Sequence, residues 1–218
     1  MNAFVLRLIA CATMLIDHIG AIGFPYEMSY RLVGRLSFPI FAFLIANGYR
    51  HTRDRSKYML RLVCFAVISE VPFDISFNKA VLEFTRQNIF FTLALGLAGL
   101  MLQDKLRKYI PAPFNSACAL LITASAAEVS GASYGAVGVV SIFLFDMWMS
   151  RKIHMVVLAV VLGASYFSMN WVQFWGVLAC IPIYFYNGKP GIRHKALQYG
   201  FYLFYPIHML VLYYFFQL

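Results

Sequence analysis

The sequence predicts an all-α polytopic membrane protein with about nine transmembrane helices and a cytoplasmic N-terminus. Of its 218 residues, 61% are hydrophobic and only 12% are charged, whereas soluble domains carry about a quarter charged residues. So few charges cannot cover the surface of a soluble fold, so the lipid bilayer must be much of the solvent. Two further observations support this fold class: apolar runs recur along the whole chain, and basic residues concentrate in alternate loops between them.

The apolar runs are close to the length that a helix needs to cross a bilayer, roughly 20 residues with about 17 to 25 tolerated. They occupy residues 3–23, 31–50, 58–77, 87–103, 112–129, 133–149, 153–168, 172–186 and 198–216. The seventh and eighth runs are short, which is compatible with a different tilt or a partly re-entrant path. The runs leave no room for a separate soluble domain, so we expect residues 1–218 to form a single transmembrane domain.

Within the first run, Arg7 precedes the apolar stretch from Leu8 to Ile16, as basic residues precede the apolar part of a signal peptide. Asp17 and His18 interrupt the run, however, and no small-residue cleavage site follows it. We therefore expect an uncleaved first helix.

The basic residues predict the orientation of the chain. One set of alternate loops holds twelve of them: Arg50, Arg53, Arg55, Lys57, Lys105, Arg107, Lys108, Arg151, Lys152, Lys189, Arg193 and Lys195. The opposite loops hold only Lys79 and Arg86. The positive-inside rule therefore places the N-terminus in the cytoplasm and the C-terminus outside. The net charge of +9 arises from these short clusters, which is typical of loops beside anionic lipid, and we expect no nucleic-acid partner.

Familiar motifs of soluble enzymes and metal sites do not occur in the sequence. The four cysteines all lie inside apolar runs without a CxxC or metal-ligand spacing, which favours buried structural residues. There is no HExxH, phosphate-binding loop, dinucleotide fingerprint or serine-hydrolase elbow. The sequence therefore predicts no metal site.

Charged residues inside the runs are the candidates for a functional site, because an ionised side chain deep in a span costs roughly 2.5–3.5 kcal/mol. In the predicted topology, six polar residues lie in the outer halves of the first three helices: Asp17, His18, Arg31, Arg35, Glu70 and Asp74. The alternative interpretation is a structural set of ion pairs, with Arg31 or Arg35 paired to Glu70 or Asp74. His18 is the stronger functional candidate, because histidine exchanges protons near neutral pH and Asp17 is adjacent.

Three further polar residues lie inside or beside the runs. Asn88 and Tyr134 begin runs on the outer side, and His208 lies in the middle of the last run, after Pro206. Pro206 frees a backbone carbonyl and is expected to kink its helix. His208 has a hydrogen-bonded structural role as its alternative interpretation.

The spacing of Arg7 and His18 suggests a long, thin ligand. Eleven residues are about three helical turns, so both side chains project from nearly the same face, roughly 16 Å apart along the axis. Coenzyme A fits this description, with phosphates at arginine and a thioester near histidine. Gly48 permits close approach to a basic cluster that could hold phosphates, although an ordinary positive-inside loop has the same composition. Beside Arg7, the candidate residues for binding the donor are Asn47, Arg50, Arg53 and Arg61.

Several segments together resemble the TraX family, whose members are membrane proteins associated with N-acetylation of conjugative pilin. The resemblance covers most of the chain and is carried by MLIDHIG at 14–20, GRLSFPIFAF at 34–43, SEVPFD at 69–74, NIFFTLALG at 88–96 and YPIH at 205–208. The spacing from Arg7 to His18 is also similar to the Arg-x10-His motif of integral membrane acyltransferases that modify cell-surface glycans. In those enzymes the histidine is held to be catalytic, and acetyl-CoA is supplied from the cytoplasm.

The resemblance implies an acetyltransferase that takes its acetyl group from cytoplasmic acetyl-CoA. His18 would be the catalyst, Asp17 or Glu70 would orient it, and Arg7 would bind coenzyme A or have a structural role. Residues expected to face the acceptor are Arg31, Arg35, Asp74, Asn88, Tyr134 and His208. The acceptor would be an amine or hydroxyl, on a pilin N-terminus, another peptide, a glycan or a small amine, and the location a bacterial inner membrane. Direct transfer and an acetyl-histidine intermediate both remain open.

Two other classes of function also fit the residues. Buried acids, arginines and histidine mark the ion path of a proton-coupled transporter equally well, although no internal repeat supports one. A non-catalytic membrane assembly factor is the other alternative.

Overall fold

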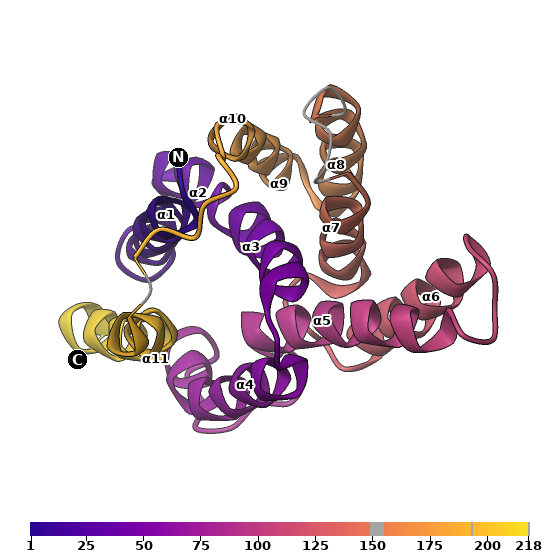
Figure 1. Cartoon of the computed structure of the whole chain (residues 1–218). Coiled ribbons are helices and arrows are strands. Elements are labelled where there is room, and N and C mark those ends of the chain that lie inside the picture. Colours follow the sequence, from indigo (N-terminus) through magenta and orange to yellow (C-terminus); the bar gives the residue numbers. More distant parts are fainter. Residues whose placement is uncertain (149–154, 193, 218) are drawn as a thin grey trace.

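A computed structural model describes residues 1–148, 155–192 and 194–217 of the chain. In these ranges the secondary structure is helical, apart from one isolated β-bridge between Gln87 and Ala132. The elements are α1 (Ala3–Gly23), α2 (Met28–Gly34), α3 (Ser37–His51), α4 (Arg55–Phe77), α5 (Ile89–Leu106), α6 (Phe114–Val129), α7 (Gly135–Trp148), α8 (Met155–Met169), α9 (Trp171–Phe174), the 3₁₀ helix η2 (Trp175–Ala179), α10 (Cys180–Tyr184) and α11 (Lys195–Gln217) (Figure 1).

Every predicted apolar run coincides with helix in the described part of the chain, which confirms the all-α prediction. The run at 3–23 begins and ends where α1 does, the runs at 58–77 and 112–129 end where α4 and α6 end, and the other described ends shift by a few residues. The predicted residues 149, 153 and 154 lie outside the described ranges. Within the described ranges, three helical stretches are long and apolar enough to cross a membrane: Ala3–Gly23, Met28–His51 and Ile89–Leu106.

Two of the runs are not continuous helices, contrary to their prediction as single spans. The run at 172–186 is divided among α9, η2 and α10, in line with its short length. The run at 31–50 is divided into α2 and α3 at Arg35 and Leu36. Pro39 explains this second break, because its ring would clash with the carbonyl of Arg35 in an unbroken helix. In the first turn of α3 its missing N–H has no cost.

Polar side chains define where several helices begin. Asn2 accepts a hydrogen bond from the Val5 amide at the start of α1, and Asn88 accepts one from the Phe90 amide at the start of α5. Asp54 accepts from the Lys57 amide at the start of α4. Hydrogen bonds from Lys57 hold the pKa of the Asp54 carboxyl below its usual value. The backbone amide of Lys57 has the larger effect and its side chain the smaller one. These caps satisfy amides that have no partner inside the helix.

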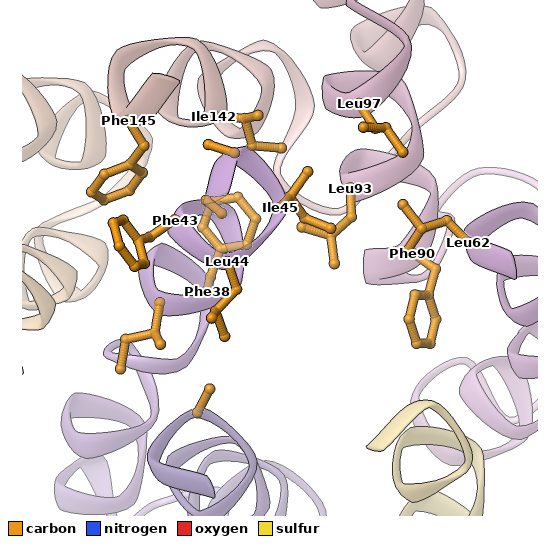
Figure 2. Packing of buried hydrophobic residues seen from close by; sticks show 14 of the residues in the cluster. Phe38, Phe43, Leu44, Ile45, Leu62, Phe90, Leu93, Leu97, Ile142 and Phe145 are labelled. Atoms are coloured by element: carbon orange, nitrogen blue, oxygen red, sulfur yellow. The ribbon is translucent and has the colours of Figure 1, made fainter. Parts of the chain in front are cut away.

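Helix α3 is central to the packing. It contacts α1 on one side and α5 and α7 on another (Figure 1). Figure 2 shows its side chains Phe43 and Ile45 among apolar residues of the neighbouring helices. The rings of Phe43 and Phe145 meet edge to face, with centroids 5.7 Å apart. Helix α11 packs against both α1 and α4, which brings the C-terminal helix beside the N-terminal one.

Candidate functional site

A cavity of about 470 Å³ is lined by residues of α1, α2, α3, α4, α5, α9 and α11 and of the loops beside them. Five of the predicted site residues line it: Asp17, His18, Arg31, Arg35 and Tyr134. Three of the loops predicted to lie outside contribute to its wall, through Pro25, Arg86 and Asn170, and Ser133 lies next to a fourth. We call this space the outer cavity.

An ion-pair cluster forms one wall of the outer cavity. Asp17 Oδ1 is 2.5 Å from Arg35 Nη2, and Asp17 Oδ2 is 2.9 Å from Arg31 Nη1. The cluster is largely shielded, since the side chains of Asp17, Arg31 and Arg35 are 13%, 30% and 8% exposed. The predicted pairing of these arginines with Glu70 or Asp74 was therefore wrong in its partner. Asp17 is engaged with the arginines rather than with His18, so its predicted role in orienting His18 is not what the contacts show.

Two glycines allow α1 and α2 to approach closely enough for this cluster to form. A Cβ atom on Gly34 would lie 2.2 Å from the Cβ of Asp17, and one on Gly20 would lie 2.3 Å from the Cβ of Tyr30. Such distances are far below van der Waals contact, so neither position has space for a side chain.

Gly34→Ala is expected to push Asp17 away from the arginines. Because overpacking typically costs about 1–3 kcal/mol, we expect a lower free energy of unfolding of the purified protein in detergent. Gly200→Ala is the matched control, because a Cβ atom added at Gly200 would meet no atom within 4 Å. Equal stability of the two variants would contradict the close approach.

His18 forms a hydrogen-bonded pair with His208, which is 190 residues away in sequence. His18 Nδ1 lies 2.7 Å from His208 Nε2, and His208 Nδ1 lies 2.6 Å from the Phe204 carbonyl oxygen. A carbonyl only accepts, so His208 Nδ1 carries its proton and neutral His208 presents a lone pair at Nε2. His18 then donates from Nδ1 and keeps its own lone pair on Nε2. His208 is thus a partner of His18 and is absent from the lining of the outer cavity.

Three other predicted site residues lie away from the outer cavity and support the loop between α4 and α5. Asp74, which is fully buried, accepts hydrogen bonds from the side chain of Asn78 and from the amide of Glu83. Glu70 accepts from the side-chain amide of Asn88. The other carboxylate oxygen of Glu70 has no hydrogen-bond partner among the described residues. Arg86 reaches the outer cavity from the loop that these contacts hold.

Two further cavities continue from the outer one toward the N-terminus. The middle cavity, of about 140 Å³, shares Met14, Phe41, Ile89 and Tyr205 with the outer cavity. The inner cavity, of about 340 Å³, shares Arg7, Gly48, Thr52, Gln198 and Phe201 with the middle one. Neighbouring cavities thus have walls in common. Arg7 lines the middle and inner cavities, and His18 lines the outer cavity. The guanidinium of Arg7 lies 6.0 Å from the centroid of the Phe201 ring.

The remaining predicted donor-binding residues occupy different places. Asn47 lines the inner cavity and accepts a hydrogen bond from Tyr186. Arg61 lines the middle cavity, and its Nε has no hydrogen-bond partner among the described residues. Arg50 forms an ion pair with Asp146 at 2.7 Å, so its charge is already paired. Arg53 is exposed and lines none of these three cavities.

Comparison with known proteins identifies the family. The TraX family, described as "TraX protein", matches residues 3–215. The chain belongs to the TraX family. It is also similar to a protein of Dichelobacter nodosus named "Probable fimbrial assembly protein FimC, serogroup H1", with 30% identity over 240 aligned residues that cover 97% of this chain and 94% of the relative. No solved structure matches.

The segments that carry the resemblance to the TraX family contribute to the outer and middle cavities and to the histidine pair, and none of them lines the inner cavity. Segment 14–20 supplies Asp17 and His18, segment 34–43 supplies Arg35, and segment 205–208 supplies Tyr205 and His208. Sequence reasoning did not select five polar residues of the outer wall: Ser37, Arg86, Ser133, Asn170 and Gln173. Short polar residues at the ends of apolar runs are common in any membrane protein, so no signal distinguished them. Tyr205 was within the YPIH segment but was not selected as a site residue.

Proposed function

We propose that this TraX-family protein is a membrane-embedded acetyltransferase that moves an acetyl group from acetyl-CoA to an amine or hydroxyl acceptor in the outer cavity. The observation that supports this most is the series of three cavities with shared wall residues, in which Arg7 lines the inner and middle cavities and His18 lines the outer one. A donor with a charged head and a narrow arm matches a series in which a small middle cavity separates two larger ones.

We also propose the topology that the sequence predicted, with about nine spans and the N-terminus in the cytoplasm. The inner cavity is lined by His51, Thr52 and residues of the 186–195 segment, which belong to two of the basic loops. The start of the chain joins them, since the Ala3 amide donates to the Lys189 carbonyl. The loops poor in basic residues line the outer cavity instead. The positive-inside rule then assigns the inner cavity to the cytoplasmic face of a bacterial inner membrane.

The donor would enter from the inner cavity. Arg7 and Lys195 are cationic residues of its wall and would contact the phosphates. The pantetheine arm would pass through the middle cavity, beside apolar residues such as Leu93 and Phe41. Arg61, with an unpaired Nε at this level, can donate a hydrogen bond to the arm. The thioester would then lie near His18, consistent with the roughly 16 Å between the two residues along α1.

His18 would act as the general base. Its Nε2 lone pair, set by the hydrogen bond to His208, takes a proton from the acceptor nitrogen while that nitrogen attacks the acetyl carbonyl carbon. The carbon–nitrogen bond forms, the carbon–sulfur bond breaks, and the proton passes from His18 to the departing thiolate. The products are an acetamide and free coenzyme A. His208 is a positioning residue in this scheme, because it fixes which nitrogen of His18 is basic.

The relative supports a proposal for the acceptor class. A similar protein carries the name of a fimbrial assembly protein, so we propose a pilin N-terminus or another amine at the cell surface as acceptor. The test is a purified protein in lipid nanodiscs, supplied with acetyl-CoA and candidate amines. We expect saturable acetyl-CoA binding and release of free coenzyme A that depends on the amine. Absence of binding would contradict the proposal and favour a transporter or an assembly factor.

Arg7→Ala is expected to weaken acetyl-CoA binding about tenfold or more, because a hydrogen bond to a charged group contributes about 1.5–3 kcal/mol. The measurement is the Kd of acetyl-CoA for the protein in nanodiscs. Arg107→Ala is the matched control, since Arg107 is exposed at the end of α5 and lines none of the three cavities. An unchanged Kd in the Arg7 variant would contradict the path of the donor.

A further inference from the structure

We infer that the acceptor carries an anionic group, a carboxylate or a phosphate, close to the amine that is acetylated, and that Arg31, Arg35 and Arg86 bind this anion. The inference rests on the proposed function and names the chemical class of its acceptor.

The charge of the outer cavity is the first argument. Its charged lining residues are three arginines and one aspartate, so the wall has a formal charge of +2 when His18 is neutral. Arg35 is only 8% exposed, and a buried guanidinium without enough counter-charge is costly inside a membrane. Asp17 is the one acid of the wall, and each of its carboxylate oxygens is already within ion-pair distance of an arginine. An anion in the cavity would balance the remaining charge.

The unused donors of the cluster are the second argument. A guanidinium has five N–H donors in a planar fork. The hydrogen bonds of Arg31 within the described residues all come from Nη1, which serves the carboxylate and carbonyl of Asp17. Arg35 uses Nε for the Arg31 carbonyl and Nη2 for Asp17. Arg86 is exposed and has no ion pair in the described part of the chain. Carboxylates and phosphates are the groups that such forks bind in pairs of parallel hydrogen bonds.

The position of the cluster is the third argument. Asp17, which holds the two arginines, precedes His18 directly in α1, and both residues face the same cavity. The arginines and His18 are therefore close together. If the arginines bind the anionic group of the acceptor while His18 contacts its amine, the two groups must be separated by only a few bonds. Small molecules of this class are β-alanine and O-phosphoethanolamine.

Binding of these probes in the absence of acetyl-CoA tests the inference. Wild-type protein in nanodiscs is heated with O-phosphoethanolamine or β-alanine, and in parallel with their neutral-tailed counterparts ethanolamine and β-alaninamide. We expect at least one anionic probe to raise the unfolding midpoint in a saturable manner, and neither counterpart to do so. Equal shifts with anion and counterpart, or no shift with either anionic probe, would overturn the inference.

The variants Arg86→Gln and Arg31→Gln are expected to raise the apparent Kd of the anionic probe about tenfold, and Arg107→Gln is the matched control with an unchanged Kd. Arg86 makes no ion pair in the described part of the chain, so its variant remains informative if Arg31→Gln fails to fold. The assignment would be overturned if the Arg86 variant bound the anionic probe with wild-type affinity and the Arg31 variant either did the same or failed to fold. Since no acetyl-CoA is present, the result is independent of transfer, which is tested by release of coenzyme A.

Discussion

His18→Ala is expected to lower acetyl transfer by about 10²–10⁴-fold, the usual contribution of general-base catalysis. The variant loses the lone pair that would accept the proton of the acceptor. Because His18 is one wall residue of a cavity of about 470 Å³, its removal should enlarge the cavity and leave the fold intact. Free coenzyme A released per minute is the measurement, with the free energy of unfolding as a check on structure.

Imidazole offers a control for this variant. The truncated side chain leaves space beside the outer cavity, so added imidazole is expected to restore part of the lost rate without affecting the wild type. Full activity of His18→Ala without imidazole would exclude His18 as the base.

Asp17→Ala is expected to destabilise the protein by about 3–5 kcal/mol, the cost of leaving buried partners of an ion pair uncompensated. Both Arg31 and Arg35 lie within 3 Å of the Asp17 carboxylate. Denaturant unfolding in detergent micelles measures the change. A loss below about 1 kcal/mol would show that the cluster is not a structural element.

A double variant gives this prediction its control. In Asp17→Ala with Arg35→Gln, one of the two stranded charges is removed. We expect the double variant to be more stable than Asp17→Ala alone, which is the non-additivity expected of residues in contact. If the two losses simply add, the ion pair does not explain the effect of Asp17→Ala.

The helices could be predicted from the sequence because each apolar run is a local signal. The start and end of α1 were predicted correctly. Asn2 caps the helix before its first residue, and Phe24, in a non-helical conformation, follows its last residue. The break at Arg35 was missed, although Pro39 was visible, because a proline inside a membrane helix usually only kinks it. Arg31 in α2 and Arg35 at the break both form ion pairs with Asp17.

The partners within the site could not be predicted, because they depend on how helices pack. The choice of Asp17 as partner of the arginines depends on the contact of Gly34 with α1, which no spacing within one helix indicates. His18 and His208 meet because α11 packs against α1. Arg50 pairs with Asp146 from α7, whereas its loop alone suggested a free phosphate ligand.

The small middle cavity has a consequence for the cell as well as for the reaction. A catalyst with chambers near both membrane faces would drain the proton gradient if water and ions could pass between them. The middle cavity has a volume of only about 140 Å³, and its wall combines apolar residues such as Met14, Leu93 and Phe90 with Arg7 and Arg61. Apolar constrictions resist wetting, and fixed arginines oppose the passage of cations. In the proposed orientation it would admit an unbranched arm but oppose ion flow, so the same constriction that selects a thin donor would also preserve the membrane potential.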